Sequence, residues 1–333
     1  MDSLTQMVLG AAVGEAVLGR KVGNKAVLYG AIAGTIPDLD TFAGYFVDPV
    51  TAIEIHRGFT HSIFFSVVFA PIFGWLISKI EKRTGVGWKS WSKLVFWSLI
   101  THPLLDSFTT WGTELFWPLN TELAFKSIFV IDPLYTLPFL IFLILAMRQN
   151  RSSEKRREYN RLGLIISSSY LLLALVFKGI AYQQFEDSLE SSDIVYKRME
   201  TKPSPFNIIL WTAHAEVEDA YLIGDYSFFD DQPIDFTSYP KNHHYLDSLG
   251  KYKKVQELIE ISGGWFTIIR ERGEFVFNDL RFGKINPYDP NSSFVFSYRL
   301  IPKDGGLTVK KTEKGVGKAL KMLKDLWERI KGN

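Results

Sequence analysis

Long apolar runs alternate with short polar connections over the first half of the chain. A helix that crosses a bilayer needs about 20 mainly apolar residues, whereas a buried helix of a soluble protein is usually shorter and keeps a polar face. Four runs approach the membrane length: Ser62–Ser78, Leu94–Thr110, Pro133–Met147 and Leu162–Phe177. We therefore predict four membrane-spanning helices, the last of which extends to about Tyr182.

Two weaker apolar segments, both rich in glycine and alanine, precede these runs. They cover Thr5–Leu18 and Ala26–Ile36, which is short for a full crossing. Small residues allow two helices to approach closely, so the segments predict a tightly packed N-terminal hairpin. The pattern leaves open whether this hairpin crosses the membrane or dips into it and returns.

The pattern changes after Tyr182, where short apolar segments are separated by Asp, Asn, Gly and Pro. Five of these segments predict strands: NIILWTA, AYLIGDYSFF, WFTIIRE, EFVFNDLRF and SFVFSYRLI. The stretch VGKALKMLKDLWERIK predicts a terminal amphipathic helix with one apolar side, formed by Ala319, Leu320, Leu323, Leu326 and Ile330. The predicted fold is a polytopic α-helical membrane domain, residues 1–182, followed by a soluble α+β domain, residues 183–333.

Basic residues gather in three connections and predict an orientation. These connections are GRKVGNK, the segment from Lys79 to Lys93, and RQNRSSEKRREYNR. Six alternating passes place all three on the cytoplasmic side, with the N-terminus, the segments 38–61 and 106–126 and the C-terminal domain outside. The N-terminus lacks the basic start of a signal peptide, so we expect it to remain in the mature protein. The net charge of +2 gives no indication of a nucleic-acid partner, and none is expected.

Histidine and aspartate occur at the predicted outer ends of the apolar segments. IPDLD contributes Asp38 and Asp40, HRGFTHS contributes His56 and His61, and THPLLD contributes His102 and Asp106. The last two are four residues apart and share a helix face. If this helix starts near Lys93, they lie about 13 and 20 Å into the membrane, where an unpaired carboxylate costs roughly 3 kcal/mol or more.

This combination of imidazole and carboxylate groups predicts a site for one or two divalent cations. The chain has no cysteine, which excludes thiolate ligands, and the remaining groups suit Zn²⁺, Mn²⁺ or Fe²⁺ better than Ca²⁺ or Mg²⁺. Arg57 is a candidate contact for a phosphate. Three simpler interpretations stay open: Asp38 and Asp40 only end a helix, His56 and His61 only mark a membrane boundary, and His102 and Asp106 only bond each other.

Several other polar and aromatic residues receive structural assignments. Asp132, before Pro133, is predicted to cap a helix, and Glu15 is ambiguous between lining the site and lying at its cytoplasmic mouth. Three histidines of the C-terminal domain are predicted to lie at its surface: His214, His243 and His244. Three aromatic residues are predicted to lie in the outer membrane interface: Trp111, Trp117 and Tyr135.

These motifs resemble a known family. An MDSLTQ start followed by IPDLD, HRGFTHS and HPLLDSFTTWGTELFWP is similar to the YdjM/YbcI type of LexA-regulated inner-membrane proteins, described as metal-dependent hydrolases. The likeness covers about residues 1–180 and implies metal ligands at the six His and Asp positions. The order of motifs is also distantly similar to zinc-dependent phospholipase C and S1/P1-type nucleases. Many relatives have Thr-His where this chain has Thr5-Gln6, so the resemblance implies a ligand that Gln6 does not supply.

Taken together, the sequence predicts a membrane-bound, metal-dependent hydrolase of the cytoplasmic membrane with its site facing outward. We expect metal-activated water to attack a phosphoester in a lipid or lipid-linked substrate, with membrane lipids as partners. The candidate catalytic residues are Arg57, His61, His102 and Asp106. The alternative is a non-enzymatic protein: a metal-binding or transport protein, or a scaffold whose outer domain binds a partner.

Overall fold

The chain divides into two compact units in its computed structural model. The first comprises Met1–Tyr45, Ile55–Phe177 and Pro205–Ile208, and the second comprises Phe46–Glu54, Lys178–Ser204 and Ile209–Asn333. One of the division points, between Phe177 and Lys178, falls within helix α7 (Glu154–Ser191), which also contains the predicted boundary at residue 182. The structure describes residues 1–48, 50, 51, 56, 58–119, 121–289, 292–303, 306–312 and 319–333.

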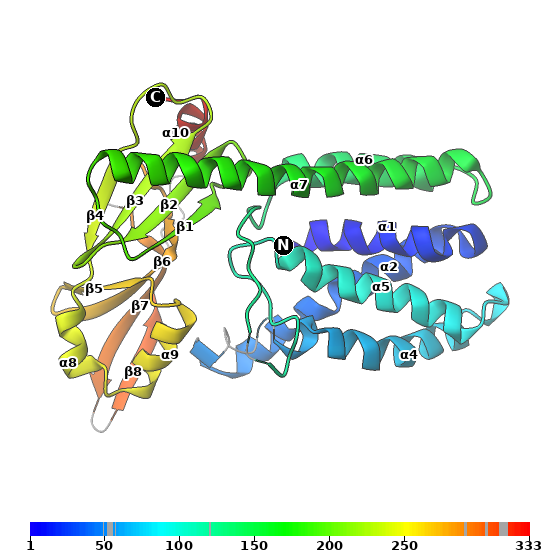
Figure 1. Cartoon of the computed structure of the whole chain (residues 1–333). Coiled ribbons are helices and arrows are strands. Elements are labelled where there is room, and N and C mark those ends of the chain that lie inside the picture. The colour runs from blue at the N-terminus through cyan, green and yellow to red at the C-terminus, as the bar shows by residue number, and fades with distance from the viewer. Residues whose placement is uncertain are drawn as a thin grey trace. The chain divides into compact units, whose positions relative to one another are not determined.

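Helices build the first unit (Figure 1). In chain order its elements are α1 (Ser3–Val22), α2 (Asn24–Thr35), η1 (Pro37–Phe46), η2 (Phe59–His61), α4 (Ile63–Ile80), η3 (Lys82–Thr84), α5 (Trp88–Asp106), α6 (Pro133–Met147) and the first part of α7 (Glu154–Ser191). Helix α1 packs against α2, α5 and α6, and α5 also packs against α2 and α4. Helix α5 therefore contacts α1, α2, α4 and η2, which is why its side chains can meet residues from distant parts of the sequence.

The predicted N-terminal hairpin is present, and glycine sets its spacing. A Cβ atom on Gly10 would lie 2.4 Å from the carbonyl oxygen of Gly30, and one on Gly14 would lie 2.4 Å from that of Ala26. Contacts this short are possible only without side chains, so the two helix backbones touch directly. Gly23, with φ of 62°, makes the turn between α1 and α2.

Two of the described helices, α4 and α7, are long and apolar enough to cross a membrane. Helix α6 is apolar but has 15 residues, and α5 has 19 residues but carries two lysines, His102 and Asp106, which lower its hydropathy. The structure therefore does not show four long spans. Asp132 does cap α6, because its carboxylate accepts the backbone N–H of Leu134 at 3.0 Å, and this confirms the predicted start of the helix.

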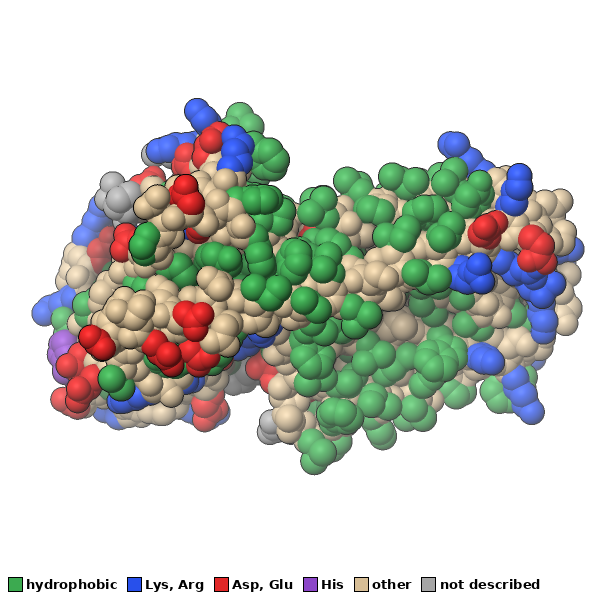
Figure 2. Space-filling model, turned by 45° about the horizontal axis from the view of Figure 1, so that its top comes forward, with side chains coloured by type: hydrophobic (Ala, Val, Ile, Leu, Met, Phe, Trp, Pro, Cys, Tyr) green, Lys and Arg blue, Asp and Glu red, His purple; other side chains and the backbone are tan. Residues whose placement is uncertain are grey.

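The outward faces of these helices are apolar. Only 22% of α4 and 17% of the most apolar part of α7 are buried, which is far less than a core helix of a soluble protein requires. Figure 2 shows hydrophobic side chains over much of the helical unit, with Lys and Arg gathered at one end of the helices. Helices of this kind need an apolar surrounding, as a bilayer provides.

Tyr135 lies inside the helical unit, so its predicted place in the membrane interface is wrong. Its side chain is 3% exposed and belongs to a core cluster with Phe139 of α6 and Leu105 of α5. Residues of α7, among them Leu164 and Tyr170, pack on the same cluster. The packing of neighbouring helices buries this side chain, although tyrosine is common at membrane interfaces. Trp111 and Trp117 are partly exposed.

The second unit contains two antiparallel meander sheets, as expected for an α+β domain (Figure 1). The first has the order β1-β2-β3-β4 and the second the order β5-β6-β7-β8. Their strands are β1 (Arg198–Pro203), β2 (Leu210–Glu216), β3 (Ala220–Ser227), β4 (Phe236–Pro240), β5 (Phe266–Glu271), β6 (Glu274–Lys284), β7 (Phe294–Lys303) and β8 (Gly306–Lys311). The helices are η4 (His243–Tyr245), α8 (Leu246–Leu249), α9 (Lys253–Ile261) and α10 (Ala319–Ile330). The five predicted segments correspond to β2, β3, β5, β6 and β7.

Two surface predictions for the second unit need correction. His214 is 3% exposed, because β2 is paired on both edges and its ring lies 6.2 Å from that of Trp265. His243 is half-buried and stacks on Phe266, while His244 is exposed as predicted. The terminal helix forms, but Leu320 and Leu323 of its predicted apolar side are exposed, whereas Leu326 is buried.

Candidate metal site

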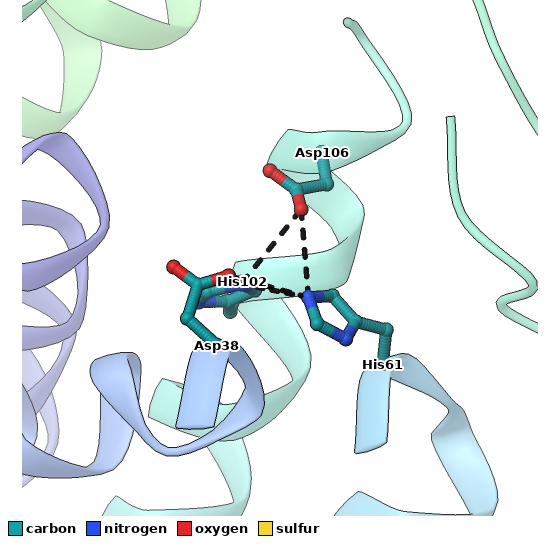
Figure 3. Close-up of side chains that lie close together, drawn as sticks. All are labelled: Asp38, His61, His102 and Asp106. Atoms are coloured by element: carbon teal, nitrogen blue, oxygen red, sulfur yellow. Dashed lines mark hydrogen bonds and ion pairs between the residues drawn. The ribbon is translucent and has the colours of Figure 1, made fainter. Parts of the chain in front are cut away.

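Three elements bring four of the six predicted ligands together. Asp38 lies in η1, directly after Pro37, the first residue of this element. His61 is the last residue of η2, just before α4. His102 and Asp106 lie one turn apart on α5 and point toward the other two side chains (Figure 3). One ligand atom from each of the four residues lies within 4.8 Å of the others.

The distances between these ligand atoms fit a single small cation. The two histidine Nε2 atoms are 3.2 Å apart, and Asp38 Oδ1 lies 3.4 Å from that of His102 and 3.6 Å from that of His61. Asp106 Oδ2 lies 3.6 and 3.8 Å from the same two nitrogens. A tetrahedral zinc site with bonds of about 2.0–2.1 Å has edges of roughly 3.3 Å. The four atoms are therefore close to the corners that such an ion requires.

The outer nitrogen of each ring fixes its protonation. His102 Nδ1 lies 2.6 Å from the carbonyl oxygen of Gly34, which can only accept, so Nδ1 carries the proton. His61 Nδ1 lies 3.3 Å from Asp40 Oδ2 and 3.1 Å from the hydroxyl of Thr60, so it too is the donor. In the neutral rings, both inner Nε2 atoms then present lone pairs to each other beside two carboxylate oxygens. A proton or a metal ion between these atoms removes the repulsion, and such outer partners are typical of metal-binding histidines.

Gln6 holds the carboxylate of Asp106. Its amide nitrogen donates to Asp106 Oδ1 at 2.8 Å and to the carbonyl oxygen of His102 at 3.2 Å, and its side chain is 1% exposed. The amino group of Met1 also contacts Asp106 Oδ1. One carboxylate oxygen is thus engaged by donors, while the other lies toward the histidines. Position 6 does not supply a histidine, but its residue orients one of the ligands.

Asp40 and His56 lie outside the group of four. Asp40 accepts from Thr60 at 2.7 Å and lies 2.7 Å from His56 Nδ1, in addition to its contact with His61. Both residues therefore support the cluster from outside. The described residues contain this one group with metal-ligand geometry, so the second ion stays a prediction. Arg57 lies outside the described residues, and its role as an anion contact stays a prediction too.

The charges of the site stabilise one another. Burial opposes ionisation of Asp38, but hydrogen bonds with His102 and His61 outweigh it and hold the pKa of this carboxyl far below its usual range. Burial likewise opposes charge on His61, yet its bonds to Asp38 and Asp40 raise the pKa of the imidazole. The site is therefore strongly attractive to positive charge, whether a proton or a metal ion supplies it.

The cluster is closed on most sides. His61, His102 and Asp106 are at most 1% exposed, whereas the Asp38 side chain is 21% exposed. Solvent or a substrate would therefore approach from the side of Asp38. Sequence reasoning missed Gln6, Thr60 and the carbonyl of Gly34 as supporting groups. Thr60 stands inside the HRGFTHS motif, but nothing in the sequence marks a backbone carbonyl as a partner.

Glu15 is not part of this site. Its carboxylate forms a buried ion pair with Arg156 of α7, at 2.6 Å to Nε and 2.7 Å to Nη2. The ambiguity of this residue is thus resolved in favour of a structural contact between α1 and α7.

Comparison with known proteins supports the family likeness. The model of the YdjM inner membrane protein family matches residues 1–181. The inner membrane protein YbcI of Escherichia coli (strain K12) is 36% identical over 111 residues, which is 32% of this chain and 62% of that relative. The chain thus matches less than two thirds of the length of YbcI. No solved structure matches. The family match covers more than half of the chain and contains all four clustered residues, so the chain belongs to the YdjM inner membrane protein family.

Proposed function

We propose that this chain is a membrane-bound, metal-dependent hydrolase that uses the cluster of Asp38, His61, His102 and Asp106. The observation that carries the proposal is the pair of inward Nε2 atoms of His61 and His102, which lie 3.2 Å apart and are flanked by two carboxylate oxygens. One divalent cation bound between these atoms would satisfy all of them at once. Zn²⁺ fits the number and kind of ligands best, and Mn²⁺ and Fe²⁺ accept the same groups.

The roles of the four residues follow from their burial. His61, His102 and Asp106 are buried and supported from outside, so they are assigned to hold the ion. Asp38 is the most exposed of the four, so its carboxylate faces the open side, where it would accept a proton from water. A bound divalent cation would supply Lewis acidity and lower the pKa of a water molecule that it binds.

The proposed substrate class is a phosphoester in a lipid or a lipid-linked molecule. A family of inner membrane proteins and a helical unit with apolar outer faces support a substrate that resides in the bilayer. The cluster lies at the start of α4 and the end of α5, near the tips of two antiparallel helices rather than at their middle. We propose that α4, α5, α6 and α7 all cross the bilayer, with the cluster on the outer side opposite the basic connections.

A second candidate function is a metal-binding protein without catalysis. Four protein ligands fill the tetrahedral shell of zinc, and this is typical of structural sites, whereas catalytic sites usually keep one position for water. In this alternative the ion would fasten η1 and η2 to α5, and Asp38 would be a permanent ligand.

Metal analysis of the detergent-purified full chain tests both candidates. We expect about one equivalent of divalent metal in the wild type and its loss in His102→Ala and Asp106→Ala, while His244→Ala, an exposed histidine elsewhere, keeps it. Unchanged metal content in the two cluster variants would overturn the site.

Hydrolysis should then be measured on lipid phosphoesters. Asp38→Asn distinguishes the candidates, because a hydrolase loses activity but keeps metal, whereas a closed structural site loses metal.

A further inference from the structure

Helix α10 presents an exposed apolar stripe. Leu320, Leu323 and Trp327 lie at helical spacing and are 85%, 43% and 59% exposed. The opposite side of the helix is used for packing, since Leu326 is buried and Ser227 donates to the carbonyl oxygen of Ile330 at 2.6 Å. The helix is thus fixed to the second unit by one face and leaves three large apolar side chains outside.

The charged residues of α10 divide between the same two faces. Asp325 accepts from Asn286 at 3.0 Å, and Arg329 pairs with Asp230 at 2.5 and 2.7 Å, so both anchor the helix. The outward charges are those of Lys321 and Lys324, together with Glu328, which pairs at 3.0 Å with Lys331 just after the helix. Figure 2 shows Lys and Arg side chains beside hydrophobic ones around α10. The exposed face therefore combines an apolar stripe with a positive charge excess.

We propose that α10 lies in the surface of an anionic lipid bilayer, with Leu320, Leu323 and Trp327 among the acyl chains and the flanking lysines at the headgroups. Lysine can extend to phosphates while its stem stays in apolar surroundings, and tryptophan prefers the membrane interface. A short helix of this kind binds weakly alone. Here the chain belongs to a membrane protein family, so the tether to the membrane domain keeps the local lipid concentration high. The proposal does not depend on the metal site.

The cysteine-free chain allows a direct test by spin labelling. Leu320→Cys and Leu323→Cys should be labelled in the full chain and reconstituted into nanodiscs of phosphatidylcholine alone or mixed with phosphatidylglycerol. Ser248→Cys in α8, an exposed position of the same unit, serves as the control. The measurement is the collision rate of each label with oxygen, which partitions into lipid, and with a water-soluble nickel chelate.

We expect the oxygen-to-nickel ratio at 320 and 323 to exceed that at 248 severalfold in the anionic nanodiscs. The triple variant Lys321→Gln, Lys324→Gln, Lys331→Gln should reduce this excess toward the value in pure phosphatidylcholine. Equal ratios at all three positions in anionic nanodiscs would overturn the proposal. So would concentration-dependent dipolar coupling between labels at 320 on separate chains in detergent, because a second copy would then cover this face.

Discussion

His61 is oriented by groups that do not belong to the cluster. Its outer nitrogen lies against Asp40 and Thr60, and Asp40 is itself held by Thr60 and His56. His56 therefore acts on the cluster through Asp40, and its ring also meets that of His61 edge-on at 5.5 Å between centroids. A carboxylate in this position fixes the ring and raises the basicity of the inner nitrogen.

We expect Asp40→Asn to weaken divalent metal binding by about 10–100-fold, because an amide supports the imidazole less well than a carboxylate does. Competition titration with a chromophoric chelator on the purified full chain measures this. His56→Gln is the matched comparison and should cause a smaller loss, since it removes only the outer partner of Asp40. A loss with His56→Gln as complete as that with His102→Ala would instead make His56 a direct ligand.

Gln6 supports the cluster through contacts that could not be predicted from the sequence. Its partners lie 96 and 100 residues away, so only the packing of α1 against α5 reveals them. Glutamine is a poor metal ligand, so at this position it looks like the loss of a ligand. Its amide nitrogen nevertheless holds Asp106 in position.

We expect Gln6→Ala to lower metal affinity by about 10-fold or more while metal still binds at excess, because the ligands remain but Asp106 loses a buried donor. Isothermal titration of the metal-free chain measures the affinity. The control is Ser98→Ala, which removes another buried hydrogen bond between α5 and α1, to the carbonyl oxygen of Gly10. If both variants bind metal equally well, Gln6 has no part in the site.

At the scale of elements, the N-terminal hairpin positions the site. Helix α2 supplies the carbonyl of Gly34 to His102 and leads directly into η1, which carries Asp38. Its separation from α1 depends on glycine contacts, because a Cβ on Gly30 would lie 2.3 Å from the carbonyl oxygen of Gly10.

We expect Gly30→Ala to destabilise the chain by about 1–3 kcal/mol and to weaken metal binding, since the clash is with backbone and forces α1 and α2 apart. Gly179→Ala in α7 is the matched control. Nothing lies within 4 Å of its added Cβ, so it should be neutral or stabilise by roughly 0.5–1 kcal/mol. Thermal unfolding in detergent compares the two, and equal melting temperatures would contradict the close packing.

The end of α7 could not be predicted from the hydropathy pattern. Its apolar run ends near Tyr182, which is where the sequence indicates a change of domain, yet the helix continues to Ser191. Phe185 and Leu189 are fully buried, and Phe185 lies 6.1 Å from Tyr226 of β3. Hydropathy registers the change from a largely exposed apolar stretch to one packed in the second unit, not the end of a helix. The hairpin and the cap of α6 were predictable because glycine spacing and an Asp-Pro pair act locally.

At the scale of the whole molecule, the sequence pointed to the residues of the cluster but not to their geometry. The six His and Asp residues could be selected because charge is costly beside apolar runs. Their division into four inner and two outer residues could not, because it depends on how residues 38, 61, 102 and 106 meet in the fold. Helix length and composition give two candidate spans among the described residues and not four, and the sidedness of the connections is open to direct measurement.

The four-span topology can be tested by labelling single cysteines with an impermeant maleimide in spheroplasts and in inverted vesicles. Lys82 and Ser152 lie in basic connections, whereas Thr121 and Asp193 follow α5 and α7, and all four are exposed. Because lysine and arginine are retained on the cytoplasmic side, we expect cysteines at 121 and 193 to react in spheroplasts and those at 82 and 152 only in inverted vesicles. Positions 82 and 121 reacting from one side would mean that α5 does not cross. Positions 152 and 193 both reacting only in inverted vesicles would exclude a crossing by α7 and place the C-terminal domain in the cytoplasm.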